Sequence, residues 1–285
     1  MLTDQFLAIA ERTPPTRYQA LERLIECWAT PIEFVCLPRL LAGRSLQAFA
    51  DHLAGGALYR SIVDSAEIRN FERNDLGQDV TLYVSNDTRR PSAGRHLLVG
   101  FAASGGRLTL PIAGFLQSIC ALETDVLLLR DPHRNHFRYG CHGFGGDFLS
   151  LAKSVAQIGV DYEQVIALGT SMGGLPAIRY SLMARSGVAI SIGGRRWNDV
   201  ARVAAGCGQV PAFDPICACL DHENPALLYI HAAEHLLDKA EAHAHSRLTG
   251  GRVLPVASVA THHVLGELWK AHSLSEFLQQ ILPVR

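Results

Sequence analysis

From residue 79 onward, short apolar runs alternate with longer stretches in which apolar residues recur every three or four positions. Runs that are apolar along their whole length are typical of strands buried on both faces, and the helical stretches between them are typical of crossover connections. We therefore expect an α/β fold, with a mostly parallel central sheet and helices on both faces. The expected strands are DVTLYVSN (79–86), HLLVGFA (96–102), DVLLLR (125–130), QVIALG (164–169), VAISIGG (188–194), ALLYIHAA (226–233) and RVLPVASVA (252–260).

The N-terminal part of the chain has a different pattern. LTDQFLAIAER and YQALERLIECW show helical spacing of apolar residues, and PPT at 14–16 and TP at 30–31 separate the helical segments. We expect a helical N-terminal extension over residues 1–66, followed by one α/β domain over residues 67–285. The helices expected in that domain are LTLPIAGFLQSICAL, GDFLSLAKSVAQIG, GGLPAIRYSLMAR, DKAEAHAHSRL and VLGELWKAHSLSEFLQQIL.

Composition excludes several classes of protein. The formal net charge of the 285 residues is -1, so there is no electrostatic case for binding nucleic acid. No apolar run approaches the ~20 residues that a membrane-spanning helix needs. The start MLTDQFLAIAERTPP has no basic segment and is a poor signal peptide, and the seven cysteines are an odd number. These features predict a cytoplasmic protein with a large core.

A serine stands between glycines where the run QVIALG meets the next helix. Residues 169–173 read G-T-S-M-G, which fits the G-x-S-x-G pattern. At such a turn the serine is strained, and its hydroxyl projects above the carboxyl ends of the strands, where open α/β sheets bind ligands. The alternative is an ordinary turn with a capping serine. The strand before it and the helix after it favour Ser171 as a nucleophile.

A serine hydroxyl is a weak nucleophile and needs a neighbouring base. With this kind of elbow the chain order is serine, acid, histidine. Thr261-His262-His263 follows the last expected strand. We favour His262 as the base because it is the first residue to leave the strand region on the loop side. His263 is the alternative, and it would otherwise begin the next helix or pack behind His262.

The sequence offers two acids. Glu234 directly follows the strand ALLYIHAA, in the loop where a triad acid belongs, and Asp238 comes four residues later. Asp238 and Glu241 fit a D-x-x-E capping box, which would give Asp238 a structural role. We therefore favour Glu234 as the acid that orients the imidazole, and Asp238 is the alternative.

An acyl-transfer site needs backbone N–H donors for the developing oxyanion. One expected donor is Met172, directly after the nucleophile. The second should come from the small, glycine-rich loop FAASGG (101–106), and we predict Ala102, with Ala103 as the alternative.

Two further segments follow strand ends and therefore overhang the expected site. In DPHRNHFRYGCHGFGGDF (131–148), four side chains could contact a sugar, a phosphate or a carboxylate: Arg134, His136, Arg138 and Tyr139. A solvated loop is the alternative. The segment GGRRWND (193–199) could supply Arg195, Arg196 and Trp197. The group Cys207, Cys217, Cys219 and His222 lacks the usual zinc-ligand spacing, so no metal site is predicted.

Residues 79–285 resemble the α/β-hydrolase superfamily in the elbow GTSMGG, the loop FAASGG, and the late acid and histidine. The layout is similar to that of bacterial serine esterases and acyltransferases that act on glycans. The accessory Sec-pathway glycan acetyltransferases, whose triad acid is a glutamate, are one example. The chain departs from the superfamily pattern because it lacks an HGGG-type motif and its favoured acid is a glutamate. The resemblance does not cover the first 65 residues.

The prediction is a serine hydrolase that acts on an ester, such as an acylated glycan or a small metabolite, through an acyl-enzyme. Ser171, His262 and Glu234 form the predicted triad, and no metal or organic cofactor is needed. One alternative is a thioesterase or acyltransferase that uses the same triad. Another is a catalytically silent domain that binds a partner through the N-terminal helices. The sequence carries no signal for an oligomeric state.

Overall fold

The computed structural model describes residues 4–44, 46–86, 91–119, 123–185, 187–195 and 225–282. Its centre is an eight-stranded sheet in the order β1-β2-β4-β3-β5-β6-β7-β8. β2 pairs antiparallel with β1 and β4, and every other neighbouring pair is parallel. The strands are β1 (Phe71–Gly77), β2 (Val80–Ser85), β3 (His96–Phe101), β4 (Thr124–Leu129), β5 (Gln164–Thr170), β6 (Val188–Ile192), β7 (Ala226–Ala232) and β8 (Arg252–Val256). The predicted α/β architecture is confirmed.

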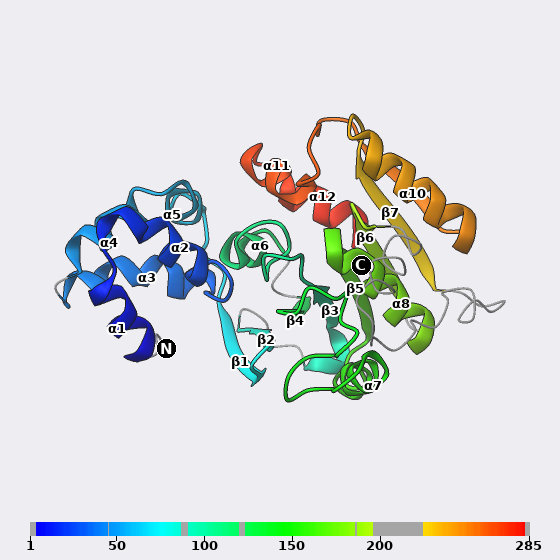
Figure 1. Cartoon of the computed structure of the whole chain (residues 1–285), viewed down its shortest axis with the longest axis horizontal. Helices are drawn as coiled ribbons and strands as arrows, with labels where there is room; N and C mark the ends of the chain where they lie inside the picture. Colours follow the sequence, from blue (N-terminus) through cyan, green and yellow to red (C-terminus); the bar gives the residue numbers. More distant parts are fainter. Residues whose placement is uncertain are drawn as a thin grey trace.

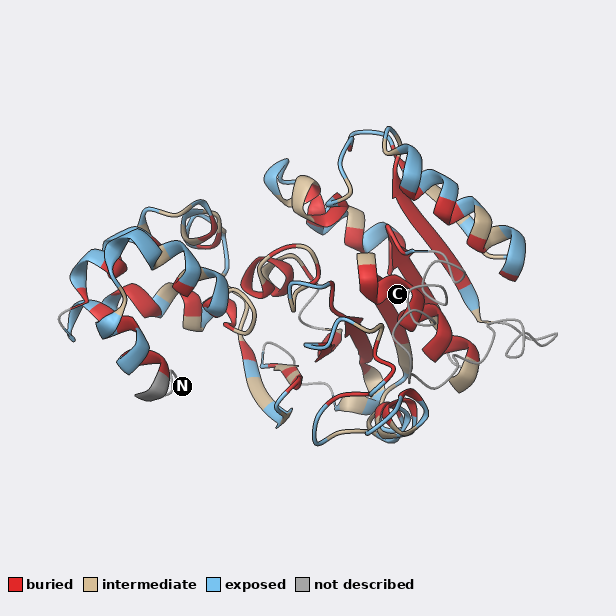
Figure 2. Cartoon of the chain, in the orientation of Figure 1, coloured by how far each residue is buried: buried red, intermediate tan, exposed pale blue. Residues whose placement is uncertain are grey.

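Helices cover both faces of the sheet (Figure 1). Alternate residues of each central strand point to opposite faces, so Leu98 and Leu128 lie in one apolar cluster while Leu97 and Leu127 lie in the other. The first cluster is closed by α6 (Ile112–Ser118), α11 (Val264–Lys270) and α12 (Leu274–Ile281). The second is closed by α7 (Phe148–Gly159), α8 (Gly174–Ala184) and α10 (Leu236–Thr249). Figure 2 shows the central strands buried between these layers.

Two strand predictions need correction. β1 was not expected, because its sequence FERNDLG is polar. It lies at the edge of the sheet, pairs only with β2, and buries only Phe71, so it needs few apolar residues. β8 ends at Val256 instead of residue 260. The residues from 257 to 263 form the turn into α11, and this turn carries His262.

Five helices precede the sheet: α1 (Asp4–Arg12), α2 (Tyr18–Ile25), α3 (Pro31–Ala42), α4 (Gln47–Ala54) and α5 (Ala57–Val63). α3 begins with a capping box in which Thr30 and Glu33 exchange hydrogen bonds. The helices share a core that also takes in Ala113 of α6 and the partly buried Trp269 of α11. The proposed division at residue 66 falls between α5 and β1, but the two parts pack against each other.

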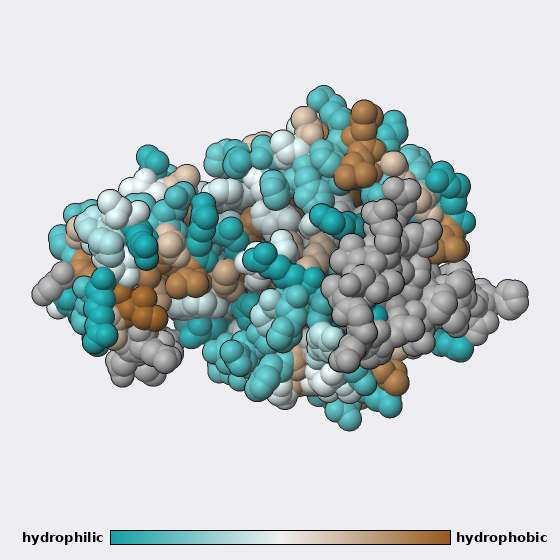
Figure 3. Space-filling model, in the orientation of Figure 1, coloured by the Kyte–Doolittle hydropathy of each residue, from teal (hydrophilic) through white to brown (hydrophobic). Residues whose placement is uncertain are grey.

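The surface of the N-terminal helices is mixed in character. Figure 3 shows apolar side chains gathered on this part of the molecule, beside hydrophilic ones. Ile9, Leu24 and Leu40 are exposed there. Among the described residues, no helix combines the length and apolar character needed to cross a membrane.

A buried ion pair joins the strands at the end of the sheet where β3 and β4 begin. The Asp125 carboxylate accepts hydrogen bonds from the Ser85 amide at 2.9 Å, the Tyr162 hydroxyl at 2.9 Å and the Arg95 guanidinium at 2.8 Å. Asp125 is fully buried and the side chain of Arg95 is 9% exposed. Because both charges are removed from water, each depends on the other.

We predict that Asp125→Ala lowers the free energy of unfolding by about 3–5 kcal/mol, because it leaves the Arg95 charge buried without a partner. The control is Asp161→Ala, which removes an exposed carboxylate near Tyr162 and should change stability by no more than about 0.5 kcal/mol. Urea denaturation of both variants measures the difference. Equal stabilities for the two variants would contradict the prediction.

Candidate active site

Ser171 lies at a sharp turn between β5 and α8. It is half-buried and begins the short 3-10 turn Ser171–Gly173, with a left-handed φ of 52°. That conformation is unfavourable for a residue with a side chain and is concentrated at functional sites. A Cβ atom at Gly169 would overlap the Gly173 carbonyl, and one at Gly173 would overlap the Phe101 carbonyl. The two glycines therefore allow β5, the turn and the end of β3 to cross in close contact.

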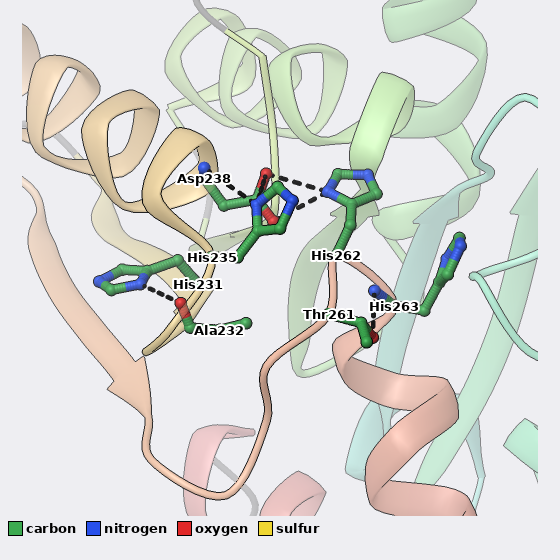
Figure 4. A network of polar contacts seen from close by, with 7 residues as sticks. All are labelled: His231, Ala232, His235, Asp238, Thr261, His262 and His263. Carbon is green, nitrogen blue, oxygen red and sulfur yellow. Dashed lines mark hydrogen bonds and ion pairs between the residues drawn. The ribbon is translucent and has the colours of Figure 1, made fainter.

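His262 lies against a buried carboxylate, as Figure 4 shows. Its Nδ1 atom is 2.8 Å from Oδ2 and 2.9 Å from Oδ1 of Asp238, which belongs to the first turn of α10. The Asp238 side chain is 4% exposed and the His262 side chain 28%. An ionised carboxylate only accepts hydrogen bonds, so Nδ1 carries the proton and donates it. Nε2 of the neutral ring is then left as an acceptor, which is the tautomer that a general base requires.

The geometry corrects the preferred acid. Glu234 is exposed in the turn after β7, and it is Asp238 that meets His262. The capping prediction for Asp238 is also wrong, because α10 begins two residues earlier than expected and its N-cap is His235. Asp238 thus occupies the third helical position. At the start of α10 the buried residues are Asp238 and Glu241, whereas Leu236 and Leu237 are exposed at 79% and 61%, so apolar spacing does not mark the helix start.

The two neighbouring histidines take different places. His263 is exposed, serves as the N-cap of α11, and points away from Asp238 in Figure 4. The structure therefore brings His262, the favoured histidine, to the carboxylate.

A second imidazole, which sequence reasoning missed, also meets this carboxylate. His235 Nδ1 lies 3.1 Å from Asp238 Oδ1. Within the described ranges, His235, Asp238 and His262 form the one group whose potential metal-ligand atoms all lie within 4.8 Å of one another. Two imidazoles and a carboxylate are a donor set that suits zinc. Such an ion would compete with the hydrogen bond that His262 Nδ1 already makes to Asp238.

Gly193, just after β6, packs against His262 and Asp238. Its φ is +60°, and its amide donates to the Ile230 carbonyl at 2.9 Å. A Cβ atom there would lie 3.0 Å from His262 Cε1 and 3.1 Å from Asp238 Oδ2. The absence of a side chain therefore lets the backbone pack directly against the histidine and its carboxylate.

The structure is compatible with one of the predicted oxyanion donors and not with the other. Met172 is buried and is the second residue of the 3-10 turn, so its N–H is one of those that have no acceptor within a helix. The prediction of Ala102 as a donor must be corrected, because its amide donates to the Leu129 carbonyl at 3.0 Å. The alternative, Ala103, donates to the Arg107 carbonyl at 2.8 Å. The ladder between β3 and β4 continues one residue past the expected loop start and uses the Ala102 donor.

The next amide in this loop is that of Ser104. Ser104 is exposed, and its N–H is absent from the backbone hydrogen bonds of the described residues. Among the described residues, it is the first amide after β3 that has no backbone acceptor.

One residue of the predicted segment 131–148, which follows β4, contacts the serine turn. Nδ1 of His136 lies 3.0 Å from the Met172 carbonyl oxygen. Arg134 and Tyr139 are exposed, whereas Arg138 is buried. In the second predicted segment, residues 193–195 are described. The other candidates fall outside the described residues: Arg196, Trp197, Cys207, Cys217, Cys219 and His222.

Gly193 and Gly143 give a matched test of the support beneath His262. Both have positive φ, but a Cβ atom at Gly143 would meet nothing within 4 Å. We predict that each change to Ala costs about 1–2 kcal/mol of stability through backbone strain. Only Gly193→Ala should also shift the imidazole C–H resonances of His262 in NMR spectra, because its Cβ presses on that ring. Unshifted resonances in Gly193→Ala would refute the contact.

No protein-family model and no curated protein matches the sequence. Among solved structures, a hormone-sensitive lipase from a metagenome library is similar at 14% identity and a TM-score of 0.50, over 88% of this chain and 96% of that one. Esterase B from Lactobacillus rhamnosis HN001 is similar at 11% identity and a TM-score of 0.50, over 86% of this chain and 94% of that one. With its sheet order and its serine elbow, the chain has the fold of the α/β-hydrolase superfamily.

Proposed function

We propose that the protein is a serine hydrolase that cleaves carboxylic esters through an acyl-enzyme. The observation that carries the proposal is the hydrogen bond between His262 Nδ1 and the buried Asp238 carboxylate, in a fold whose elbow holds a strained serine. Ser171 is the nucleophile, His262 the general base and Asp238 the acid that orients the base. Asp238 takes the role that the sequence had suggested for Glu234.

The reaction follows from the proton positions. Ser171 Oγ attacks the ester carbonyl while Nε2 of His262 accepts its proton. The resulting imidazolium is stabilised by Asp238, which stays ionised, and it then gives the proton to the departing alkoxide. Water attacks the acyl-enzyme in the second half of the cycle, again losing its proton to Nε2. The bond between the acyl carbon and Ser171 Oγ then breaks, and Nε2 returns the proton to Oγ, which releases the carboxylic acid and regenerates the free serine.

The negative charge on the carbonyl oxygen needs donors in both halves of the cycle. We assign this role to the Met172 amide and, in place of Ala102, to the Ser104 amide. Support for Met172 comes from its position directly after the nucleophile at the start of the turn that leads into α8. Unsatisfied amides at a helix start also favour negative charge through the helix dipole.

The substrate is proposed at the level of an acyl ester, with an acylated glycan or a small metabolite as its alcohol part. Ser171 and His262 are both only half-buried, so the reacting groups are accessible from outside the chain. Transfer of the acyl group to a hydroxyl acceptor would use the same residues with an alcohol in place of water.

A fluorophosphonate probe tests the proposed nucleophile directly. We predict that the wild-type protein is labelled at Ser171 and hydrolyses p-nitrophenyl acetate, and that Ser171→Ala does neither while it melts within a few degrees of wild type. Mass spectrometry of the labelled peptide identifies the site. A wild-type protein that resists the probe would be the silent, partner-binding member of the fold, and the proposal would fail.

Asp238→Asn and Glu234→Gln separate the two acids. We predict that Asp238→Asn lowers kcat by about 10³–10⁴, because the amide favours the wrong imidazole tautomer and removes the counter-charge. Glu234→Gln should stay within about twofold of wild type, because Glu234 is exposed and the carboxylate bonded to His262 is that of Asp238. Steady-state kinetics of both variants, with melting temperatures as the folding control, decide between them. The reverse ranking would return the role to Glu234.

A further inference from the structure

His136 lies beside the elbow without belonging to the proposed triad. Its Nδ1 atom is 3.0 Å from the carbonyl oxygen of Met172, the residue that follows Ser171. A carbonyl only accepts, so the Nδ1 atom of His136 carries a proton and donates it. Burial lowers the pKa of His136, which favours the neutral ring. The contact is therefore a neutral hydrogen bond from a side chain to the backbone of the elbow.

Hydrogen bonds within the loop fix the backbone around His136. The Asp131 carboxylate accepts hydrogen bonds from the amides of Asn135 at 2.7 Å and Phe137 at 2.9 Å. The Asn135 side chain in turn accepts from the Arg138 amide at 3.0 Å. These bonds close the loop on itself and fix its backbone. The solvated loop considered from the sequence does not describe this part of the segment.

Three non-glycine residues of this loop have left-handed backbone conformations. The φ angles are 53° at Arg134, 61° at His136 and 60° at Phe137. Each such residue costs on the order of 1–3 kcal/mol and persists only where surrounding contacts determine it. Strain of this kind is concentrated at functional sites, so these angles favour a role for the loop beyond chain connection.

Phe137 anchors the loop to the strand beside the elbow. Its ring is fully buried and meets the Phe101 ring edge-on, with 5.3 Å between centroids and 84° between planes. Phe101 ends β3, and its carbonyl is the atom that a side chain at Gly173 would overlap. The loop thus packs on β3 through Phe137 and on the elbow through His136, the two backbone segments that cross at Ser171.

We propose that His136 is a positioning residue for the oxyanion hole. By holding the Met172 carbonyl, it restricts rotation of the Met172 backbone and so fixes the direction of the N–H on the same residue. The inference rests on the proposed function, in which that N–H stabilises the oxyanion. Loss of one whole donor costs on the order of 10²–10³ in kcat. A misdirected donor should therefore cost about tenfold to a hundredfold.

Three variants test this role. His136→Leu replaces the imidazole with an apolar side chain of similar size and so removes the donor, whereas His136→Asn places an amide N–H near the position of Nδ1. His133→Leu is the control, because it removes an exposed imidazole from the same loop. The measurements are kcat and KM for p-nitrophenyl acetate, the rate of fluorophosphonate labelling, and the melting temperature.

We expect His136→Leu to lose about tenfold to a hundredfold in kcat and in labelling rate, with KM changed by no more than about twofold. His136→Asn should recover to within about threefold of wild type, and His133→Leu should match wild type. Wild-type kcat in His136→Leu would overturn the proposal. Equal losses of kcat in the Leu and Asn variants, accompanied by equal losses of melting temperature, would also overturn it by showing a packing role. If the wild type and His133→Leu are themselves inert, the proposed function has failed and this inference falls with it.

Discussion

The close crossing of backbone at Ser171 is the constraint on which the site depends. The left-handed serine reverses the chain so sharply that α8 starts five residues after the last glycine of β5, and glycines at 169 and 173 remove the side chains that would block the turn. The same crossing seats the elbow on the end of β3. Because β3 leads into the loop with the candidate oxyanion donor, the nucleophile and that loop are held by one contact. Neither could move without opening a backbone interface that has no room for a Cβ atom.

The parallel direction of neighbouring strands brings the remaining site residues together. β5, β6, β7 and β8 run side by side in the same direction, so the residues that follow them gather at one edge of the sheet. Ser171 follows β5, Gly193 follows β6, Asp238 comes after β7, and His262 comes after β8. Residues nearly a hundred positions apart thereby reach one edge without long connections. The bare backbone of Gly193 then fills the space beneath the histidine and its carboxylate.

The sequence predicted what depends on local pattern and missed what depends on contact. Fully apolar strands and the glycine–serine turn leave clear local signals, so the sheet and the position of Ser171 were predictable. The choice between Glu234 and Asp238 depended on where α10 begins, and apolar spacing does not mark that start, because the helix buries Asp238 and Glu241 there and exposes its two leucines. The use of the Ala102 amide depended on one more rung of the β3–β4 ladder. No pattern in the sequence reports that rung, and none reports that His136 faces the Met172 carbonyl.

The N-terminal helices also contact the edge of the sheet where the candidate site lies. Directly after α2, the backbone carbonyls of Glu26 and Cys27 accept hydrogen bonds from the Ile112 amide at 2.8 Å and the Arg130 guanidinium at 2.9 Å. Arg107 forms an ion pair with Glu26.

The contacts of Ile112 and Arg107 hold the segment that runs from the end of β3 to α6, which includes the proposed Ser104 donor. The Tyr83 hydroxyl adds a hydrogen bond to the Trp28 carbonyl at 2.9 Å and ties the same helical segment to β2. A donor in a loop is useful only if the loop is stationary, because an oxyanion gains little from a donor that must first be oriented. The N-terminal helices therefore restrain the loop that carries Ser104, while the turn at Ser171 restrains the nucleophile.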